Sequence, residues 1–158
     1  MALKRLFKEL KQYNDDMNPY YSIGVDNKNM FTWNIMMIIP DPDSPYFEST
    51  LDCMMTFPPT YPNKPPEFKF LTKIFHPNVY TDGKVCISIL HDGKDEYGYE
   101  DVSLRWNPSR SIDSILMSII TMISDPNTES PANVDASVMF KNERDKYNKI
   151  VYSIVAKT

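Results

Sequence analysis

The sequence predicts an α+β fold: an N-terminal helix, a four-stranded antiparallel meander sheet, an irregular segment, then two to three C-terminal helices. Three observations support this class: a helical period at the N-terminus, four short runs of aromatic and branched residues before residue 71, and helical periods after Pro108. Consecutive strands followed by helices are typical of an antiparallel sheet with segregated helices. The 158 residues contain no repeat and no long linker, so we expect a single domain over residues 1–158.

The first element is an amphipathic helix. Apolar side chains recur every three or four positions, at Leu3, Leu6, Phe7, Leu10 and Tyr13. The other side is basic, with Lys4, Arg5, Lys8 and Lys11. This basic side is either a solvated face or a docking face for an acidic partner.

Strand-like runs follow at residues 20–26, 30–39 and 51–57 and around Phe68 and Phe70. The third run alternates apolar and polar residues, which puts Cys53 on its apolar side as an inert core thiol. Between the last two runs, residues 57–66 are too rich in proline for a helix or a central strand, and they predict an exposed loop.

Helical periodicity returns after Pro108. Residues 112–123 predict a largely buried helix with Ser109 or Ser111 as its N-cap and Asp125-Pro126-Asn127 as its end. A short helix is expected over residues 133–141 and an amphipathic one over residues 147–155.

Composition excludes several classes. The net charge of −4 argues against nonspecific nucleic-acid binding, and four glycines are too few for a glycine-rich phosphate loop. Two cysteines cannot build a disulfide framework, and the longest apolar run, residues 35–39, is too short to span a bilayer. With no apolar signal core near Met1, we expect a reduced protein of the cytosol or nucleus.

The irregular middle holds His76, Cys86 and His91, and three interpretations compete for them. Their separations of ten and five residues match no standard metal site. A Cys–His hydrolase would need a base beside the thiol, and nothing in the sequence puts His76 against Cys86. From the residues alone, plain structural cysteine and histidine are favoured over both of these sites.

The third interpretation comes from a resemblance of the whole string, and it displaces the purely structural one. The motifs are Phe75-His76-Pro77-Asn78, Cys86 eight residues after Asn78, and Trp106-Asn107-Pro108. Together they resemble the signature of ubiquitin-conjugating enzymes, and the resemblance covers nearly the whole chain. It includes the first helix, the proline loop Tyr61-Pro62-x-x-Pro65-Pro66 and the segment Asp125-Pro126-Asn127.

A closer resemblance is to class G conjugating enzymes, with the cell-division-cycle enzymes next. Trp106 lies 20 positions after Cys86, which leaves an insertion at about residues 91–105 with a local charge of −3. Its acids are Asp92, Asp95, Glu96, Glu100 and Asp101. The segment Ala132-Asn133-Val134-Asp135-Ala136-Ser137 also matches class G. Class G enzymes build degradation-linked chains, including those of endoplasmic-reticulum-associated degradation.

The resemblance implies that Cys86 accepts ubiquitin from an activating enzyme as a thioester and passes it to lysine amines with a ligase. A thiol with an ordinary pKa near ~8.5 has enough thiolate for this exchange. The family motif offers Asn78 either as oxyanion stabiliser or as loop support, and it makes His76 structural and not a base. ATP is used by the activating enzyme, so no bound cofactor or metal is expected.

The incoming lysine must lose a proton before it attacks. Ser130 and Ser88 stand where many relatives have aspartate, and with Tyr80 they are expected to form the acceptor-lysine environment. These replacements weaken any account with a carboxylate base. We therefore expect the acidic insertion to supply the negative field that orients the acceptor.

Partner surfaces follow by position. Lys4, Arg5 and Lys8 match the helix used by the activating enzyme and ligases, whereas Pro62, Asn63 and Pro108 match the loops that meet RING-type ligases. Asn63 replaces a bulky apolar anchor. Ser22 matches a sheet face where some relatives bind a second ubiquitin. An adaptor at the endoplasmic-reticulum membrane is a further expected partner, while nucleic acid and direct membrane insertion are not expected.

Two departures from the family pattern concern turns. Ile38-Ile39-Pro40 lacks the usual glycine before its proline, and Glu48-Ser49-Thr50-Leu51 lacks the glycine of the following hairpin. These turns are expected to differ in shape. Two rival functions remain at this stage: a non-catalytic binding module, which the presence of Cys86 disfavours, and conjugation of a different ubiquitin-like modifier.

Overall fold

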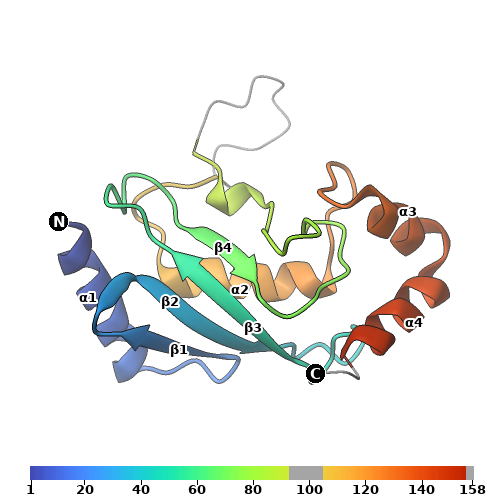
Figure 1. Ribbon diagram of the computed structural model, residues 1–158, viewed down its shortest axis with the longest axis horizontal. Coiled ribbons are helices and arrows are strands. Elements are labelled where there is room, and N and C mark those ends of the chain that lie inside the picture. The colour runs from blue at the N-terminus through green and yellow to red at the C-terminus, as the bar shows by residue number, and fades with distance from the viewer. Residues whose placement is uncertain (93–104, 156–158) are drawn as a thin grey trace.

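The computed structural model describes residues 1–92 and 105–155, and it confirms the α+β class (Figure 1). Helix α1 (Ala2–Asp15) precedes strands β1 (Tyr21–Asp26), β2 (Asn29–Ile38), β3 (Thr50–Thr56) and β4 (Glu67–Phe70). A 3-10 turn, η1 (Ser88–Leu90), follows in the described part of the irregular segment. Helices α2 (Ile112–Ser124), α3 (Val134–Asn142) and α4 (Arg144–Val155) complete the described chain.

The four strands form one antiparallel meander in the order β1-β2-β3-β4. Ile35 lies opposite Cys53, and Cys53 lies opposite Phe70, so these three side chains share one face of the sheet. All three are at most 2% exposed. The alternating pattern of the sequence therefore reports the core face of the sheet correctly.

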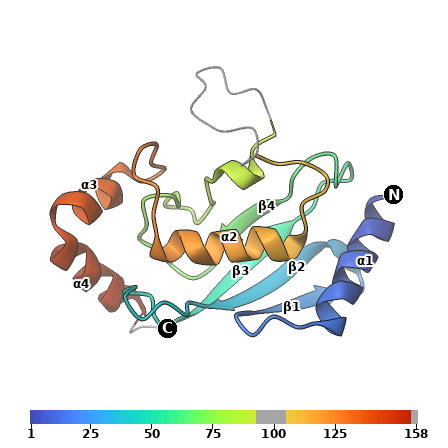
Figure 2. The ribbon, with the colours of Figure 1, turned by 180° about the vertical axis from the view of Figure 1, so that it is seen from behind.

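Helix α2 runs across this face, as Figure 2 shows from behind. Seven of its residues are buried: Ile112, Ile115, Leu116, Ile119, Ile120, Met122 and Ile123. The Ser111 side chain caps the helix by accepting a hydrogen bond from the Ser114 N–H at 3.1 Å. Of the two expected caps, Ser111 is therefore the correct one. Helices α3 and α4 lie beyond the end of α2 that is farther from α1 (Figure 1).

Helix α1 forms as expected, but the residues that face the rest of the protein are not the apolar residues that the sequence pattern grouped together. Leu3 is 44% and Phe7 is 55% exposed, whereas Glu9 is only 6% exposed. Arg5, assigned to the outer basic side, makes contacts to the rest of the protein. The predicted apolar side is therefore only partly buried, and a polar network described below also holds this helix against the protein.

The turn before β3 contains a residue in the left-handed region although its segment lacks glycine. Glu48 adopts a φ of 62°, the left-handed region that usually takes glycine, and its N–H donates to the Ile39 carbonyl at 3.0 Å. A side chain in this region costs about 1 kcal/mol. The second chain segment without glycine thus keeps a tight turn at the expense of local strain.

Candidate active site around Cys86

A tight turn positions Cys86. Val79 pairs with Val85 and Lys69 with Lys84, so the chain leaving β4 folds back beside it. Gly83 has a φ of 96°, and a Cβ added there would lie 2.2 Å from the Phe70 carbonyl oxygen. Only glycine fits at this position. The turn ends with the Cys86 N–H donating to the Asn78 carbonyl at 3.0 Å, which fixes the cysteine backbone against the His-Pro-Asn motif.

His76 is fully buried and uses both ring nitrogens. The Asn78 N–H donates to its Nδ1 at 3.0 Å, so Nδ1 is unprotonated and Nε2 donates to the Met122 carbonyl at 2.8 Å. Burial lowers the pKa of the imidazole from 6.5 to about 4. A neutral ring with both nitrogens engaged ties the motif to the end of α2, and this arrangement gives His76 no role as a base.

The Asn78 side chain is 2% exposed and pairs with the backbone of Asn127. Its Nδ2 donates to the Asn127 carbonyl at 2.7 Å, and its Oδ1 accepts from the Asn127 N–H at 2.8 Å. Both ends of the amide thus join the Cys86 loop to the segment after α2. This geometry favours loop support over an oxyanion donor, because the amide is already engaged.

The two cysteines lie in different environments. Cys53 is 1% exposed on the core face of β3, and burial raises the pKa of its thiol well above the ordinary range. Cys86 is partly exposed. A thiol that reacts with another protein must be accessible, so only Cys86 has the environment of a reactive thiol.

Two side chains flank the Cys86 thiol. The exposed Tyr80 phenol has a pKa above its ordinary value, first because of its electrostatic interaction with Cys86, then because of burial and a side-chain hydrogen bond to Cys86. On the other flank, His91 Nε2 lies 3.9 Å from Cys86 Sγ. Sequence reasoning did not predict that His91 lies beside Cys86. The contact depends on the short turn η1 between the two residues, and no sequence signal predicted this turn.

The remaining expected site residues are Ser88, Ser130 and the acids of the insertion. Ser88 is partly exposed and begins η1, two residues after Cys86, and Ser130 is exposed in the segment that follows α2. Of the acids of the insertion, Asp92 is described, and it forms an ion pair with Lys64 of the proline loop at 3.0 Å. The others, Asp95, Glu96, Glu100 and Asp101, lie outside the described residues.

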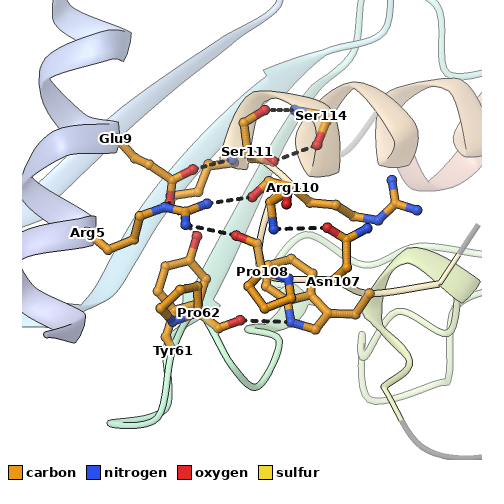
Figure 3. Close-up of polar contacts among 12 residues, drawn as sticks. Arg5, Glu9, Tyr61, Pro62, Asn107, Pro108, Arg110, Ser111 and Ser114 are labelled. Atoms are coloured by element: carbon orange, nitrogen blue, oxygen red, sulfur yellow. Dashed lines mark hydrogen bonds and ion pairs between the residues drawn. The ribbon is translucent and has the colours of Figure 1, made fainter. Parts of the chain in front are cut away.

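The expected partner surface is built on a buried polar network (Figure 3). Glu9 accepts hydrogen bonds from the Tyr61 hydroxyl and, at 2.8 Å, from the Ile112 N–H at the start of α2. Arg5 lies 3.4 Å from Glu9 and donates to the carbonyls of Pro108 and Arg110 at 2.8 and 2.9 Å. The network thus joins α1 to both expected ligase loops.

Within the partner surface, the side chains divide into two groups. Lys4, Lys8, Asn63 and Pro108 are exposed, and Pro62 is partly exposed. The Pro62 carbonyl accepts from Trp106 Nε1 at 3.0 Å. Arg5, by contrast, is partly exposed, and its guanidinium contacts Glu9 and the carbonyls of Pro108 and Arg110.

The described residues contain neither a metal-binding cluster nor a helix that could span a membrane. Over residues 1–92 and 105–155, no three His, Cys, Asp or Glu side chains come together as a metal site. No helix in the same ranges is long and apolar enough to cross a membrane.

Ser22 is exposed beside Met36 on the outer face of the sheet, where Met36 is 46% exposed.

Comparison with known proteins identifies the family. A family model described as "Ubiquitin-conjugating enzyme" matches residues 5–155. The ubiquitin-conjugating enzyme E2 7 of Arabidopsis thaliana is 46% identical, over 100% of this chain and 94% of the relative. The E2 15 of Schizosaccharomyces pombe is 44% identical, over 97% and 92%. The human ubiquitin-conjugating enzyme E2 G2 is 42% identical, over 99% and 96%, which is consistent with the resemblance to class G. The chain therefore belongs to the ubiquitin-conjugating enzyme family, a family of transferases.

Proposed function

We propose that Cys86 accepts ubiquitin from an activating enzyme as a thioester and transfers it, with a RING-type ligase, to lysine amines in degradation-linked chains. The observation that carries this proposal is the contrast between the two thiols. Cys86 is partly exposed between Tyr80 and His91 on a fixed turn, and Cys53 is in the core. Thioester exchange needs an accessible thiol at a defined place.

In this proposal His76 and Asn78 support the loop. Their hydrogen bonds to Met122 and Asn127 hold the Cys86 turn against α2 and the segment after it. The acceptor lysine approaches the exposed side of the thiol, near Tyr80, Ser88 and Ser130. Since none of these three is a carboxylate, deprotonation of the lysine depends on its surroundings and not on one strong base.

The acidic insertion at about residues 91–105 is proposed to orient the acceptor lysine within the single conjugating domain of residues 1–158. Its charge of −3 would attract an ammonium group toward Cys86. The part of the insertion nearest the site is anchored, because Asp92 pairs with Lys64.

Partners would bind the surface formed by Lys4, Lys8, Pro62, Asn63 and Pro108. An activating enzyme with acidic side chains would contact the lysines, and a ligase would contact the two loops. By resemblance to class G enzymes, an adaptor would recruit the chain to the cytoplasmic side of the endoplasmic reticulum.

The test of the transfer step uses ATP, activating enzyme and ubiquitin with the wild-type protein and two variants. We expect wild type and Cys53→Ala to form an adduct that a thiol reductant removes, and Cys86→Ala to form none. Cys53→Ala is the matched control because it removes the other thiol. An adduct on Cys86→Ala, or an adduct of wild type with another ubiquitin-like modifier only, would refute the proposal.

To test the insertion, its five acids are replaced, Asp by Asn and Glu by Gln. The rates of ubiquitin loading and of chain building are then measured separately. The control neutralises five acids elsewhere on the surface, Asp15, Asp16, Glu67, Glu143 and Asp145. We expect slower chain building with normal loading in the first variant only. Equal chain-building rates in the two variants would show that the position of the charge does not matter.

A further inference from the structure

The contact between Cys86 and His91 results from the local fold of the chain. The Leu90 N–H donates to the Ile87 carbonyl at 3.1 Å, and the His91 N–H donates to the Ser88 carbonyl at 2.9 Å. These bonds close the turn η1, so the chain bends back after Cys86. As a result, His91 Nε2 lies 3.9 Å from Cys86 Sγ, although five residues separate them in the sequence.

The backbone of His91 is also held from the other side. The Trp106 N–H donates to the His91 carbonyl at 2.9 Å, and the Trp106 indole N–H donates to the Pro62 carbonyl at 3.0 Å. The neighbouring Asp92 pairs with Lys64. Trp106 itself is only 7% exposed. His91 is therefore anchored to the proline loop through described residues on both sides of the insertion.

No other described side chain offers a proton acceptor to this thiol in the same way. Both ring nitrogens of His76 are engaged, and the amide of Asn78 is paired with Asn127. The Tyr80 phenol, whose pKa is raised first by its electrostatic interaction with Cys86, makes a side-chain hydrogen bond with Cys86 in which the hydroxyl is the donor. The thiol thus has a donor on one flank and an imidazole nitrogen on the other.

We infer that His91 is a further catalytic residue, whose Nε2 accepts the Cys86 thiol proton during thioester exchange. The inference rests on the proposed function of Cys86. It requires the imidazole tautomer with its proton on Nδ1, which leaves a lone pair on Nε2. The 3.9 Å separation is long for an S–H···N bond, and catalytic hydrogen bonds of this kind shorten when the reaction partner binds.

The step balances without any further reactant. The S–H bond of Cys86 breaks as its electron pair attacks the carbonyl carbon of the ubiquitin thioester on the activating enzyme, and the proton moves to His91 Nε2. The C–S bond to the activating enzyme then breaks, and the departing sulfur takes the proton from His91. The products are the Cys86 thioester and a free thiol on the activating enzyme.

The test compares His91→Gln with wild type in two reactions. The first is alkylation of Cys86 by iodoacetamide with no partner present, followed by mass spectrometry of the peptide that contains residue 86. The second is loading with ubiquitin by the activating enzyme. Glutamine keeps polar atoms and similar bulk but cannot take up the thiol proton. Cys53 is the internal control for folding, because a folded protein should leave this buried thiol unmodified.

We expect His91→Gln to slow both alkylation and loading about tenfold or more, on the modest side of general acid–base contributions. Rates equal to wild type in both reactions would overturn the inference. Slower loading with normal alkylation would also overturn it, since His91 would then act on the partner. If His91→Ala slowed alkylation and loading while His91→Gln kept the wild-type rates, His91 would only pack against the site. Failure of wild type to load would refute the proposed function, whereas the alkylation result would still decide the role of His91.

Discussion

The side chain of Asn78 and the backbone of Asn127 hold each other through two hydrogen bonds, 2.7 and 2.8 Å long. One residue belongs to the His-Pro-Asn motif and the other to the segment after α2. No secondary structure joins these two segments, so the pair is part of what keeps the Cys86 turn in place. Its position predicts a specific consequence of substitution.

Replacing Asn78 with Ala leaves the Asn127 N–H and carbonyl without these partners. We expect a loss of about 1–3 kcal/mol in the free energy of unfolding, and slower loading together with slower transfer to lysine. Urea unfolding and single-turnover kinetics measure the two effects, with Asn142→Ala, an exposed asparagine at the end of α3, as the control. Normal stability and loading with slow transfer alone would instead assign Asn78 to the oxyanion.

Replacing Gly83 with Ala tests the turn that positions Cys86. The new Cβ would lie 2.2 Å from the Phe70 carbonyl oxygen, and the φ of 96° is unfavourable for alanine. We expect a loss of about 2 kcal/mol or more in the free energy of unfolding and slower ubiquitin loading. Gly24→Ala is the matched control, because its Cβ would meet nothing closer than 3.9 Å. Equal midpoints of urea denaturation for the two variants would contradict this account of the turn.

Arg5 and Lys8 lie on the same helix, and we expect their substitutions to act differently. Arg5 donates to the Pro108 and Arg110 carbonyls, so Arg5→Ala should lower the free energy of unfolding by about 2 kcal/mol. Lys8 is exposed, so Lys8→Ala should change stability by less than about 0.5 kcal/mol.

The Arg5 and Lys8 variants also distinguish a residue that supports the fold from a residue that contacts the activating enzyme. Lys8→Ala should raise the KM for loading at low salt, and added salt should remove the difference from wild type because it screens surface charges. If Arg5→Ala instead kept full stability and raised KM only at low salt, Arg5 would be a direct partner contact.

His76 predicts a dependence of stability on pH. Its pKa is about 4 in the folded protein and near 6.5 when unfolded, so below pH 6.5 the unfolded chain binds a proton that the folded protein does not. This group therefore costs no stability at pH 7, and its cost grows as pH falls from about 6.5 to about 4, reaching roughly 3 kcal/mol.

Urea unfolding of wild type and His76→Gln at several pH values between 7 and 4.5 measures this term. The variant should be less stable at pH 7, because it loses the fit of the ring between Asn78 and Met122. The difference between the two proteins should shrink as pH falls. A constant difference across this range would contradict the burial of a neutral His76.

Much of the fold could be predicted because the core repeats a simple pattern. Alternation reports the inner face of β3, and the apolar face of α2 matches its buried residues. The inner side of α1 could not be predicted this way. The Glu9 carboxylate is buried by partners from distant segments, Tyr61 and Ile112, and periodicity carries no information about them.

The candidate site, too, could be predicted only in part from the sequence. Motif resemblance predicts roles for Cys86, Asn78 and His76, and in the structure the imidazole of His76 is buried with both ring nitrogens hydrogen-bonded. It does not predict the contact of His91 with Cys86, since this depends on the hydrogen bonds of η1 and on the anchoring of Trp106. Spacing alone cannot show that a short turn returns the chain to the thiol.

The most direct test of the account is an ester trap on Cys86. With ATP, activating enzyme and ubiquitin, Cys86→Ser should form a slowly accumulating adduct that resists thiol reductants and is cleaved by hydroxide, since an oxygen ester replaces the thioester. Mass spectrometry should map the linkage to the peptide containing residue 86. A hydroxide-resistant adduct, or a linkage at any other residue, would contradict the assignment of Cys86 as the residue that receives ubiquitin.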